Sequence, residues 1–290
     1  KEVGARLIVV GTHGRRPVPR FFLGSVAERV VLTADRPVLV AHPMPSSHGL
    51  EDWAKSTRRL RVTVALDHSA PSAAAVDWVR TLRKVVPCDV TFMHFYWPPG
   101  EYSRLGLVGT RSMTEPDPTT VRTLERELGA AIGVLPGEGK IELKIQPSWG
   151  ELGSRIAYEA SASDADLLVM GTHRRHGLRR LWLGATTQPT LHAATVPVVC
   201  VPAVDAEARL APQPIPALRE ILVATDFSPL ANQAIPYAYA LVGERGVVHL
   251  AHVHERTVPS PAYAYDDKTG SILGTPEEKA VLDKLKALVP

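Results

Sequence analysis

Hydrophobic positions along the chain form short β-branched runs that alternate with stretches of helical periodicity. In residues 59–203 the apolar runs are RVTVAL, DVTFMHFYW, KIELKIQ, DLLVMGTH and VPVVCVP. Helical spacing separates them, as in Val76, Val79 and Leu82 after the first run. Short apolar runs are typical of strands buried on both faces, and their alternation with helices predicts a mostly parallel sheet flanked by helices. The predicted fold class is therefore α/β, doubly wound and Rossmann-like, with five strands in this stretch.

Local signals refine this pattern between the predicted strands. Residues 98–118 are rich in glycine and proline and predict a long loop, and a helix is expected near 119–132. Ser72 stands near the start of the first helix, where we expect it to act as the cap.

The pattern recurs along the chain with a period close to 160 residues. Four pairs of equivalent positions share it: Gly11 and Gly171, Gly24 and Gly184, and Pro37 and Pro197 lie 160 apart, and Asp67 and Asp226 lie 159 apart. A period of this kind indicates a repeated structural unit.

The repeat divides the chain into unequal parts. Residues 1–45 supply the back of one unit, 59–203 a complete second unit, 204–217 a linker, and 218–290 the front of a third. Joined together, the first and last parts would still lack about thirty residues with the third strand, by comparison with the complete unit. We therefore expect a piece of a longer tandem array, in which the last part finds its partner outside this stretch.

Composition narrows the class of protein. The chain has 290 residues and a formal net charge of +3, which does not favour nucleic acid or an anionic membrane as a partner. Its two cysteines, Cys88 and Cys200, are too few for a disulfide framework or a CxxC metal site. No run approaches a membrane span, and the start of the chain lacks signal-peptide features, so we expect a cytoplasmic location.

A glycine pattern near the start of the chain carries the clearest chemistry. In the segment GTHGRRPVPRFFLGS, Gly11 and Gly14 follow a predicted strand, and Gly24 and Ser25 open a helix. Glycines let backbone amides approach a ligand, and the unpaired N–H groups of a helix start favour anions. The segment therefore predicts a phosphate site, with the Ser25 hydroxyl as a further donor. A turn without a ligand is the alternative for a single glycine pair.

Acidic residues are expected at the same edge of the sheet. Asp67 and Asp226 each end the first strand of a unit. Ligands of parallel α/β sheets bind beyond the carboxyl ends of the strands, so the acids and the glycines should converge.

These residues resemble the universal stress protein superfamily, in its ATP-binding branch, whose motif is G-x2-G-x9-G-[ST]. The matching positions are Gly11, Gly14, Gly24 and Ser25. The family also places an acidic residue after the first strand and a small apolar residue on the second strand against adenine. In the third unit these positions look like Asp226 and Val253, and in the second like Asp67 and Phe95.

The resemblance implies a function and a mode of assembly. It implies ATP as the ligand, accompanied by a divalent cation such as magnesium, and a stress-response regulator that binds the nucleotide more than it turns it over. It also implies domains that pair through their last strands, within one chain or between two. RPVLVAH and VPVVCVP would then form a pseudo-twofold pair.

The second unit departs from the family motif. Gly171 and Gly184 are kept, but Arg174 stands at the second glycine and Ala185 at the hydroxyl position. Thr186 lies one residue late, and Phe95 is bulkier than the expected side chain. Arg174 could still neutralise a phosphate, so an altered anion site and a structural unit without nucleotide both remain open.

No residue is predicted to be catalytic or to bind metal. His94 and His252 lie in the second strands and are expected to be hydrogen-bonded structural histidines rather than bases. The sequence DHS at 67–69 cannot form a triad from neighbouring residues, and the basic cluster around Arg174 favours a solvated loop over nucleic-acid binding. A non-nucleotide interaction module and a slow ATPase are the alternative functions.

Overall fold

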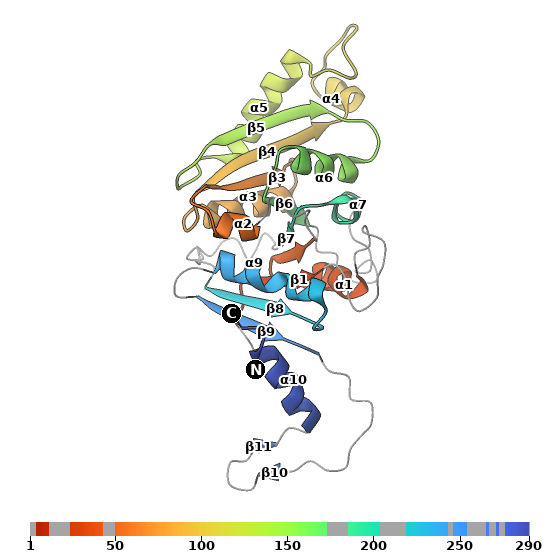
Figure 1. Cartoon of the computed structure of the whole chain (residues 1–290). Coiled ribbons are helices and arrows are strands. Elements are labelled where there is room, and N and C mark those ends of the chain that lie inside the picture. The colour runs from red at the N-terminus through yellow and green to blue at the C-terminus, as the bar shows by residue number, and fades with distance from the viewer. Residues whose placement is uncertain are drawn as a thin grey trace.

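The computed structural model describes residues 4–11, 24–42, 50–172, 185–203, 219–242, 246–253, 265–266, 271–272 and 276–289. Its main feature is a nine-stranded sheet in the order β5-β4-β3-β6-β7-β2-β1-β8-β9 (Figure 1). The strands are β1 (Leu7–Gly11), β2 (Val38–Ala41), β3 (Leu60–Ala65), β4 (Cys88–Tyr96), β5 (Ile141–Pro147), β6 (Leu167–Thr172), β7 (Val198–Pro202), β8 (Glu220–Ala224) and β9 (Val247–Ala251). A separate pair joins β10 (Tyr265–Asp266) to β11 (Ser271–Ile272).

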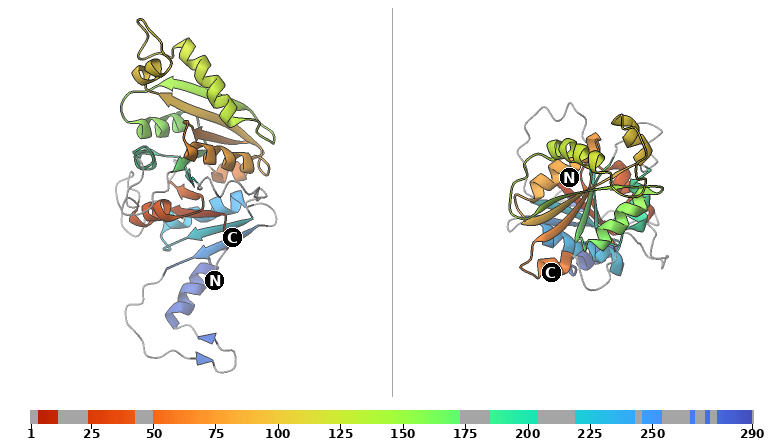
Figure 2. Two further views of the ribbon diagram at one scale, coloured as in Figure 1. Left: turned by 180° about the vertical axis from the view of Figure 1, so that it is seen from behind. Right: turned by 90° about the horizontal axis from the view of Figure 1, so that it is seen from above.

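Helices cover both faces of this sheet (Figure 2). The described helices are α1 (Ser25–Thr33), α2 (Leu50–Ala54), α3 (Ala70–Leu82), α4 (Pro98–Arg104), α5 (Pro118–Ile132), α6 (Leu152–Ala162), α7 (Thr187–Ala193), α8 (Pro229–Asn232), α9 (Ala234–Leu241) and α10 (Pro276–Lys286). The last of them, α10, lies beyond the β9 edge of the sheet (Figure 1). The predicted mixed α/β class with a mostly parallel sheet is confirmed.

Five strands form what we call the middle half, β3 to β7, and all of them run parallel. Two of its helices, α3 and α5, begin at a residue whose side chain caps them. Asp117 accepts hydrogen bonds from the backbone N–H groups of Thr119 and Thr120, and a proline occupies the first turn of α5. Gly133, with a φ of 61°, ends the same helix in a conformation that favours glycine.

The predicted long loop at 98–118 is wrong in its first third, where α4 forms. Pro98 and Pro99 occupy the first turn, where a missing N–H costs nothing. Arg104 then pairs with Glu101 one turn earlier and with Glu127 of α5, at 2.8 Å from the latter carboxylate. The prolines therefore start a helix here instead of preventing one.

The ends of the chain meet in what we call the composite half, formed by β1, β2, β8 and β9. We expected the last part of the chain to need a partner outside this stretch, but β8 pairs in parallel with β1. The reason is complementarity of register: Ile221 faces Leu7 just as Val62 faces Leu167 in the middle half. The described composite strands number four, against five in the middle half.

The two halves meet at an antiparallel pair, β2 with β7, in agreement with the pairing of last strands that the family resemblance implied. Leu39 pairs with Val199 at the centre, and Val38 with Cys200 and Val40 with Val198 flank it symmetrically. The arrangement is an intrachain pseudo-twofold. One hydrogen bond between the halves reinforces this arrangement, because Nε2 of His42 lies 2.9 Å from the Leu191 carbonyl oxygen in α7.

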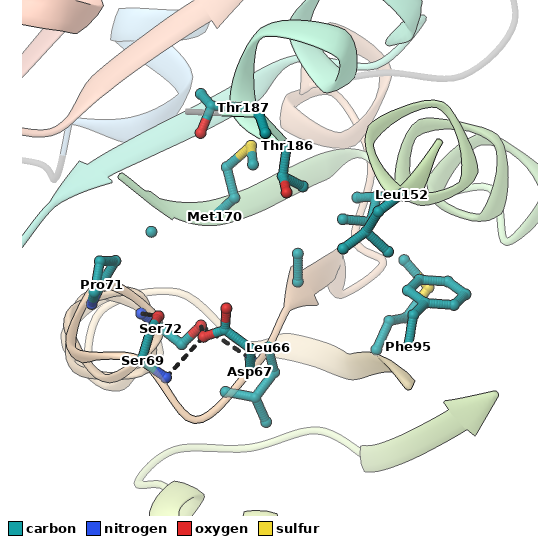
Figure 3. Close-up of a pocket in the computed structure, with 15 residues that line it drawn as sticks. Leu66, Asp67, Ser69, Pro71, Ser72, Phe95, Leu152, Met170, Thr186 and Thr187 are labelled. Atoms are coloured by element: carbon teal, nitrogen blue, oxygen red, sulfur yellow. Dashed lines mark hydrogen bonds between the residues drawn. The ribbon is translucent and has the colours of Figure 1, made fainter. Parts of the chain in front are cut away.

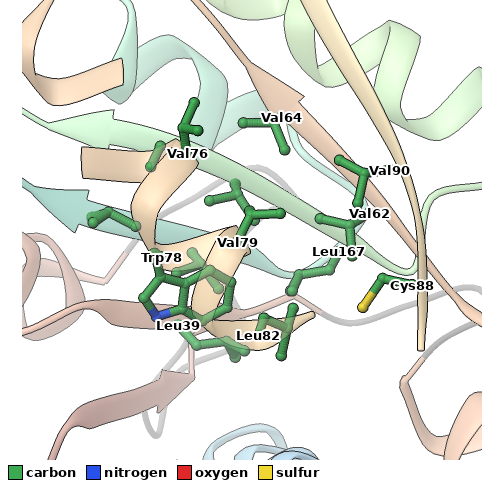
Figure 4. Close-up of a cluster of buried hydrophobic side chains, with 14 of the residues drawn as sticks. Leu39, Val62, Val64, Val76, Trp78, Val79, Leu82, Cys88, Val90 and Leu167 are labelled. Atoms are coloured by element: carbon green, nitrogen blue, oxygen red, sulfur yellow. The ribbon is translucent and has the colours of Figure 1, made fainter. Parts of the chain in front are cut away.

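Buried apolar side chains form one layer on each face of the sheet. The layer beneath α3, α5 and α9 continues across the seam, where Leu39 lies near Trp78, Val79 and Leu82 (Figure 4). The opposite layer joins α1 to α6 and α7. Because both layers combine residues of the two halves, burial of apolar surface stabilises the halves together.

None of the described helices is long and apolar enough to cross a membrane.

Candidate functional site

A pocket opens at the carboxyl ends of the strands in the middle half, where the strand order reverses between β3 and β6. This is the position at which parallel α/β sheets bind ligands. The cavity has a volume of about 280 Å³ and is shown in Figure 3. It is lined by Ala65, Leu66, Asp67, Ser69, Pro71, Ser72, Met93, Phe95, Leu152, Ile156, Met170, Gly171, Ala185, Thr186 and Thr187.

Asp67 is held in a tight turn at the mouth of this middle pocket. Its Oδ1 accepts the backbone N–H of Ser69 at 2.8 Å and the Ser72 hydroxyl at 2.5 Å. The Ser72 oxygen in turn accepts the backbone N–H of Asp67 at 2.9 Å. The carboxylate is thus fixed by the start of α3 before any ligand arrives.

These contacts also set the charge of the carboxyl group. Partial removal from water by the pocket walls would raise the pKa of Asp67. Hydrogen bonds from Ser69 and Ser72 oppose this effect and outweigh it, so the pKa lies below its usual value. Asp67 is therefore ionised at neutral pH.

The helix cap differs from the prediction. Ser69, and not Ser72, is the N-cap of α3, with its side chain accepting the Ser72 N–H at 3.3 Å. The Ser72 hydroxyl instead binds Asp67, a role that was not predicted from the sequence. The spacing D-x-S-x-x-S was the available signal, because two serines three residues apart can each serve a turn and a cap.

His94 lies behind this turn as a buried structural histidine. Its Nδ1 is 2.8 Å from the carbonyl oxygen of Leu66, and its ring packs edge-on against His68 with centroids 5.7 Å apart. Burial lowers the pKa of His94, so it is neutral at physiological pH and donates the Nδ1 proton to that carbonyl. The predicted structural role agrees with this geometry.

The glycine of the middle half is required by packing. A Cβ added to Gly171 would lie 2.1 Å from the Pro71 carbonyl oxygen, because α3 presses its first turn onto β6. Gly171 thus serves close approach of two backbones, whatever it does for a ligand.

The other predicted positions of the middle half are partly described. Ala185, Thr186 and Phe95 all line the pocket, with Thr186 directly before α7. Arg174 and Gly184 lie outside the described residues.

The composite half repeats the same frame at what we call the composite edge, the carboxyl ends of β1, β8 and β9. Extending the observed register places Gly11 opposite Thr225, one residue before Asp226. The pairing of Ala224 with Ala251 likewise places Val253 opposite Asp226, as Phe95 stands opposite Asp67. Residues more than two hundred positions apart in sequence therefore converge at one edge.

The acidic turn is also repeated there. Oδ1 of Asp226 accepts the backbone N–H of Ser228 at 2.9 Å, and the Ser228 hydroxyl oxygen accepts the N–H of Ala231 at 3.1 Å. Nδ1 of His252 lies 2.8 Å from the Thr225 carbonyl oxygen, as His94 does from Leu66. The two halves therefore share the hydrogen bonds that the aspartate, the serine and the histidine of this turn make with the backbone.

The remaining predicted residues of the composite half stand at the surface. Gly24 caps α1 through its backbone, Ser25 is the exposed first residue of that helix, and the side chain of Val253 is 88% exposed. Gly14 lies outside the described residues.

Two further findings concern metal and thiol chemistry. Among the described residues no three His, Cys, Asp or Glu side chains gather closely enough to hold a metal ion. Cys88 and Cys200 are buried free thiols, and burial raises the pKa of each to about 12. At neutral pH both are protonated and unreactive.

A family model confirms what the glycine motif indicated. The model of the universal stress protein family matches residues 1–42 and 59–202, which is more than half of the chain. The chain belongs to the universal stress protein family.

Individual relatives are distant. A universal stress protein of Mycolicibacterium smegmatis is 27% identical over 200 residues, covering 68% of this chain and 62% of that relative. The chain thus spans about three fifths of the length of the relative it matches.

Two solved structures are among those that are similar to this chain. A universal stress protein from Archaeoglobus fulgidus has 20% identity and a TM-score of 0.43, covering 69% of this chain and 62% of its own. Another, a universal stress protein in complex with cAMP, has 18% identity and a TM-score of 0.34, covering 51% of this chain and all of its own.

Proposed function

We propose that this universal stress protein binds ATP at the composite edge and acts as a nucleotide-dependent regulator. The observation that carries the proposal is the parallel pairing of β1 with β8, which brings Gly11 and Asp226 together from opposite ends of the chain. Gly11 and the Ser25 hydroxyl would serve the phosphates, and the carboxylate of Asp226 would accept hydrogen bonds from the ribose. Val253 leaves room for the adenine ring.

The chain's own groups fit such a ligand. Among the described residues the Asp226 carboxylate has one hydrogen bond, from the Ser228 backbone, so it keeps acceptor capacity for ribose hydroxyls. Magnesium, when present with ATP, would neutralise part of the phosphate charge. The His252 ring supports the turn through its Nδ1, and we assign it no part in proton transfer.

The middle pocket supports the second candidate, an interaction module without nucleotide. Its cavity of about 280 Å³ lies just below the size range typical of small-molecule sites, and Phe95 lines it where the composite edge has Val253. Ala185 offers no hydroxyl, and Asp67 is already bonded to Ser72. We therefore assign nucleotide binding to the composite edge and partner support to the middle half.

A titration of the full chain with ATP, followed by calorimetry, tests this assignment. We expect one site, weakened at least tenfold by Asp226→Ala, because a charge-assisted hydrogen bond contributes about 1.5–3 kcal/mol. Asp67→Ala is the matched control and should leave the affinity unchanged.

Three results would contradict the proposal: no ATP binding by the folded chain, loss on Asp67→Ala alone, or equal loss in both variants. Phosphate release above background that disappears in Asp226→Asn would instead support the slow ATPase.

A further inference from the structure

A second cavity lies between the two halves, at the opposite end of the strands from the middle pocket. We call it the junction cavity. It has a volume of about 400 Å³. Its lining includes Trp53, Ser56, Arg58, Arg59, Pro87 and Tyr239. Trp53 belongs to α2, the arginines precede β3, Pro87 precedes β4, and Tyr239 belongs to α9 (Figure 1). A molecule bound here would touch the middle and the composite halves at once.

The described residues that line this cavity carry positive charge. They include two arginines and no acidic residue. Arg58 is bound through both terminal nitrogens by Asp166, at 2.5 and 2.7 Å, and the Asp166 side chain is fully buried. Arg58 is therefore neutralised and fixed in position.

Arg59 keeps its charge available. The side chain is 48% exposed, and among the described residues the nearest carboxylate oxygen, on the 81% exposed Glu138, lies 3.9 Å away. An exposed pair at that distance contributes little and is readily exchanged for another anion. Arg59 is thus the group of the cavity that can bind an acidic ligand.

Planar apolar surface accompanies this charge. Trp53 packs partly on the core beneath α9, and Tyr239 is 36% exposed at the other side of the cavity. Aromatic side chains provide large contact area and favour stacked or edge-to-face contact with another ring. Hydroxyl groups of Ser56 and Thr57 complete the polar part of the lining.

We propose that the junction cavity binds a small anionic aromatic molecule, with its acidic group on Arg59 and its ring against Trp53 and Tyr239. Most of the lining residues lie outside the stretches 1–42 and 59–202 that match the family model. The cavity is separate from the composite edge, so the proposal is independent of nucleotide binding there.

The test uses the full chain and the probe 1-naphthyl phosphate, followed by the indole N–H signals in two-dimensional NMR. The Trp53 signal is assigned with Trp53→Phe. We expect this signal to shift on titration, with a Kd of about 0.5 mM or tighter for a ligand of this size. Arg59→Gln should weaken binding at least about tenfold.

Matched controls separate the contributions. Arg126→Gln removes another exposed arginine, on α5, and should leave binding unchanged. Neutral 1-naphthol should bind at least about tenfold more weakly than the phosphate ester, and inorganic phosphate should not shift Trp53.

Several results would overturn the proposal. They are no shift of Trp53 at 5 mM probe, equal binding by wild type and Arg59→Gln, equal binding of the neutral probe, or displacement of the probe by ATP. Displacement by ATP would place the probe at a nucleotide site instead. Unfolding temperatures of Trp53→Phe, Arg59→Gln and Arg126→Gln, measured alongside, confirm that each variant has folded.

Discussion

The middle pocket and the composite edge share one backbone frame and differ in the side chains placed on it. Both have an aspartate after the first strand, a serine two residues later and a histidine bound to the preceding carbonyl. They differ where a ligand would lie, since Phe95 in one half stands where Val253 stands in the other. The fold therefore preserves the acidic turn in both halves, while the side chains next to the turn decide which ligand can bind beside it.

A second difference lies at the amino ends of the same strands. Asp166, before β6, is fully buried and receives Arg58, whereas the equivalent position before β1 is the exposed Arg6. The sign of the charge is also reversed at a neighbouring pair of equivalent positions, which are Arg61 in the middle half and Glu220 in the composite half. The charge pair stabilises one half and has no buried counterpart in the described part of the other.

The largest expected effect on stability comes from breaking the ion pair between Arg58 and Asp166. Asp166→Asn should lower the free energy of unfolding by about 1.5–3 kcal/mol, because it removes the charge of the buried carboxylate that binds Arg58 through two hydrogen bonds. Arg6→Gln, at the equivalent exposed position, should change it by no more than about 0.5 kcal/mol. Urea denaturation measures both, and similar values for the two variants would show that the halves are not distinguished in this way.

A smaller effect is expected at the glycine of β6. Gly171→Ala places a Cβ 2.1 Å from the Pro71 carbonyl oxygen and should destabilise the fold by about 1–3 kcal/mol. Gly129→Ala, in α5, meets no atom within 4 Å and should instead stabilise by about 0.5–1 kcal/mol. If thermal unfolding shifted in the same direction for both, close packing of α3 on β6 would not be the reason for Gly171.

The smallest effect sharpens the comparison of the two acidic turns. Ser72→Ala removes a hydrogen bond to Asp67, so the pKa of Asp67 should rise toward its usual value. A lowered folded-state pKa contributes stability above the unfolded pKa, and this stability is lost as pH falls through the folded value. In the variant that contribution should therefore shrink.

Carboxyl carbon NMR titration measures this change. An unchanged pKa of Asp67 in Ser72→Ala would exclude the hydroxyl as a cause of the shift.

Sequence pattern alone determined the fold class, most strands and the family. The apolar runs located all five strands of the middle half to within one or two residues. Strands buried on both faces, such as β6 and β7, need continuous apolar side chains, whereas the edge strand β5 alternates and is largely exposed or half-buried. The repeat period predicted which residues are equivalent, and the antiparallel pairing of the last strands followed from the family resemblance. The division of the chain into family units and the ligand of each unit stay predictions.

Tertiary structure decided three things that no local pattern carries. It paired β8 with β1, because register and buried area between segments far apart in sequence depend on the whole sheet. It turned the Ser72 hydroxyl toward Asp67, since two serines near a helix start can each cap it until the turn geometry selects one. It also placed α2, in the connection between β2 and β3, beside α9 and thereby formed the junction cavity, because long-range packing and not periodicity brings these two helices together.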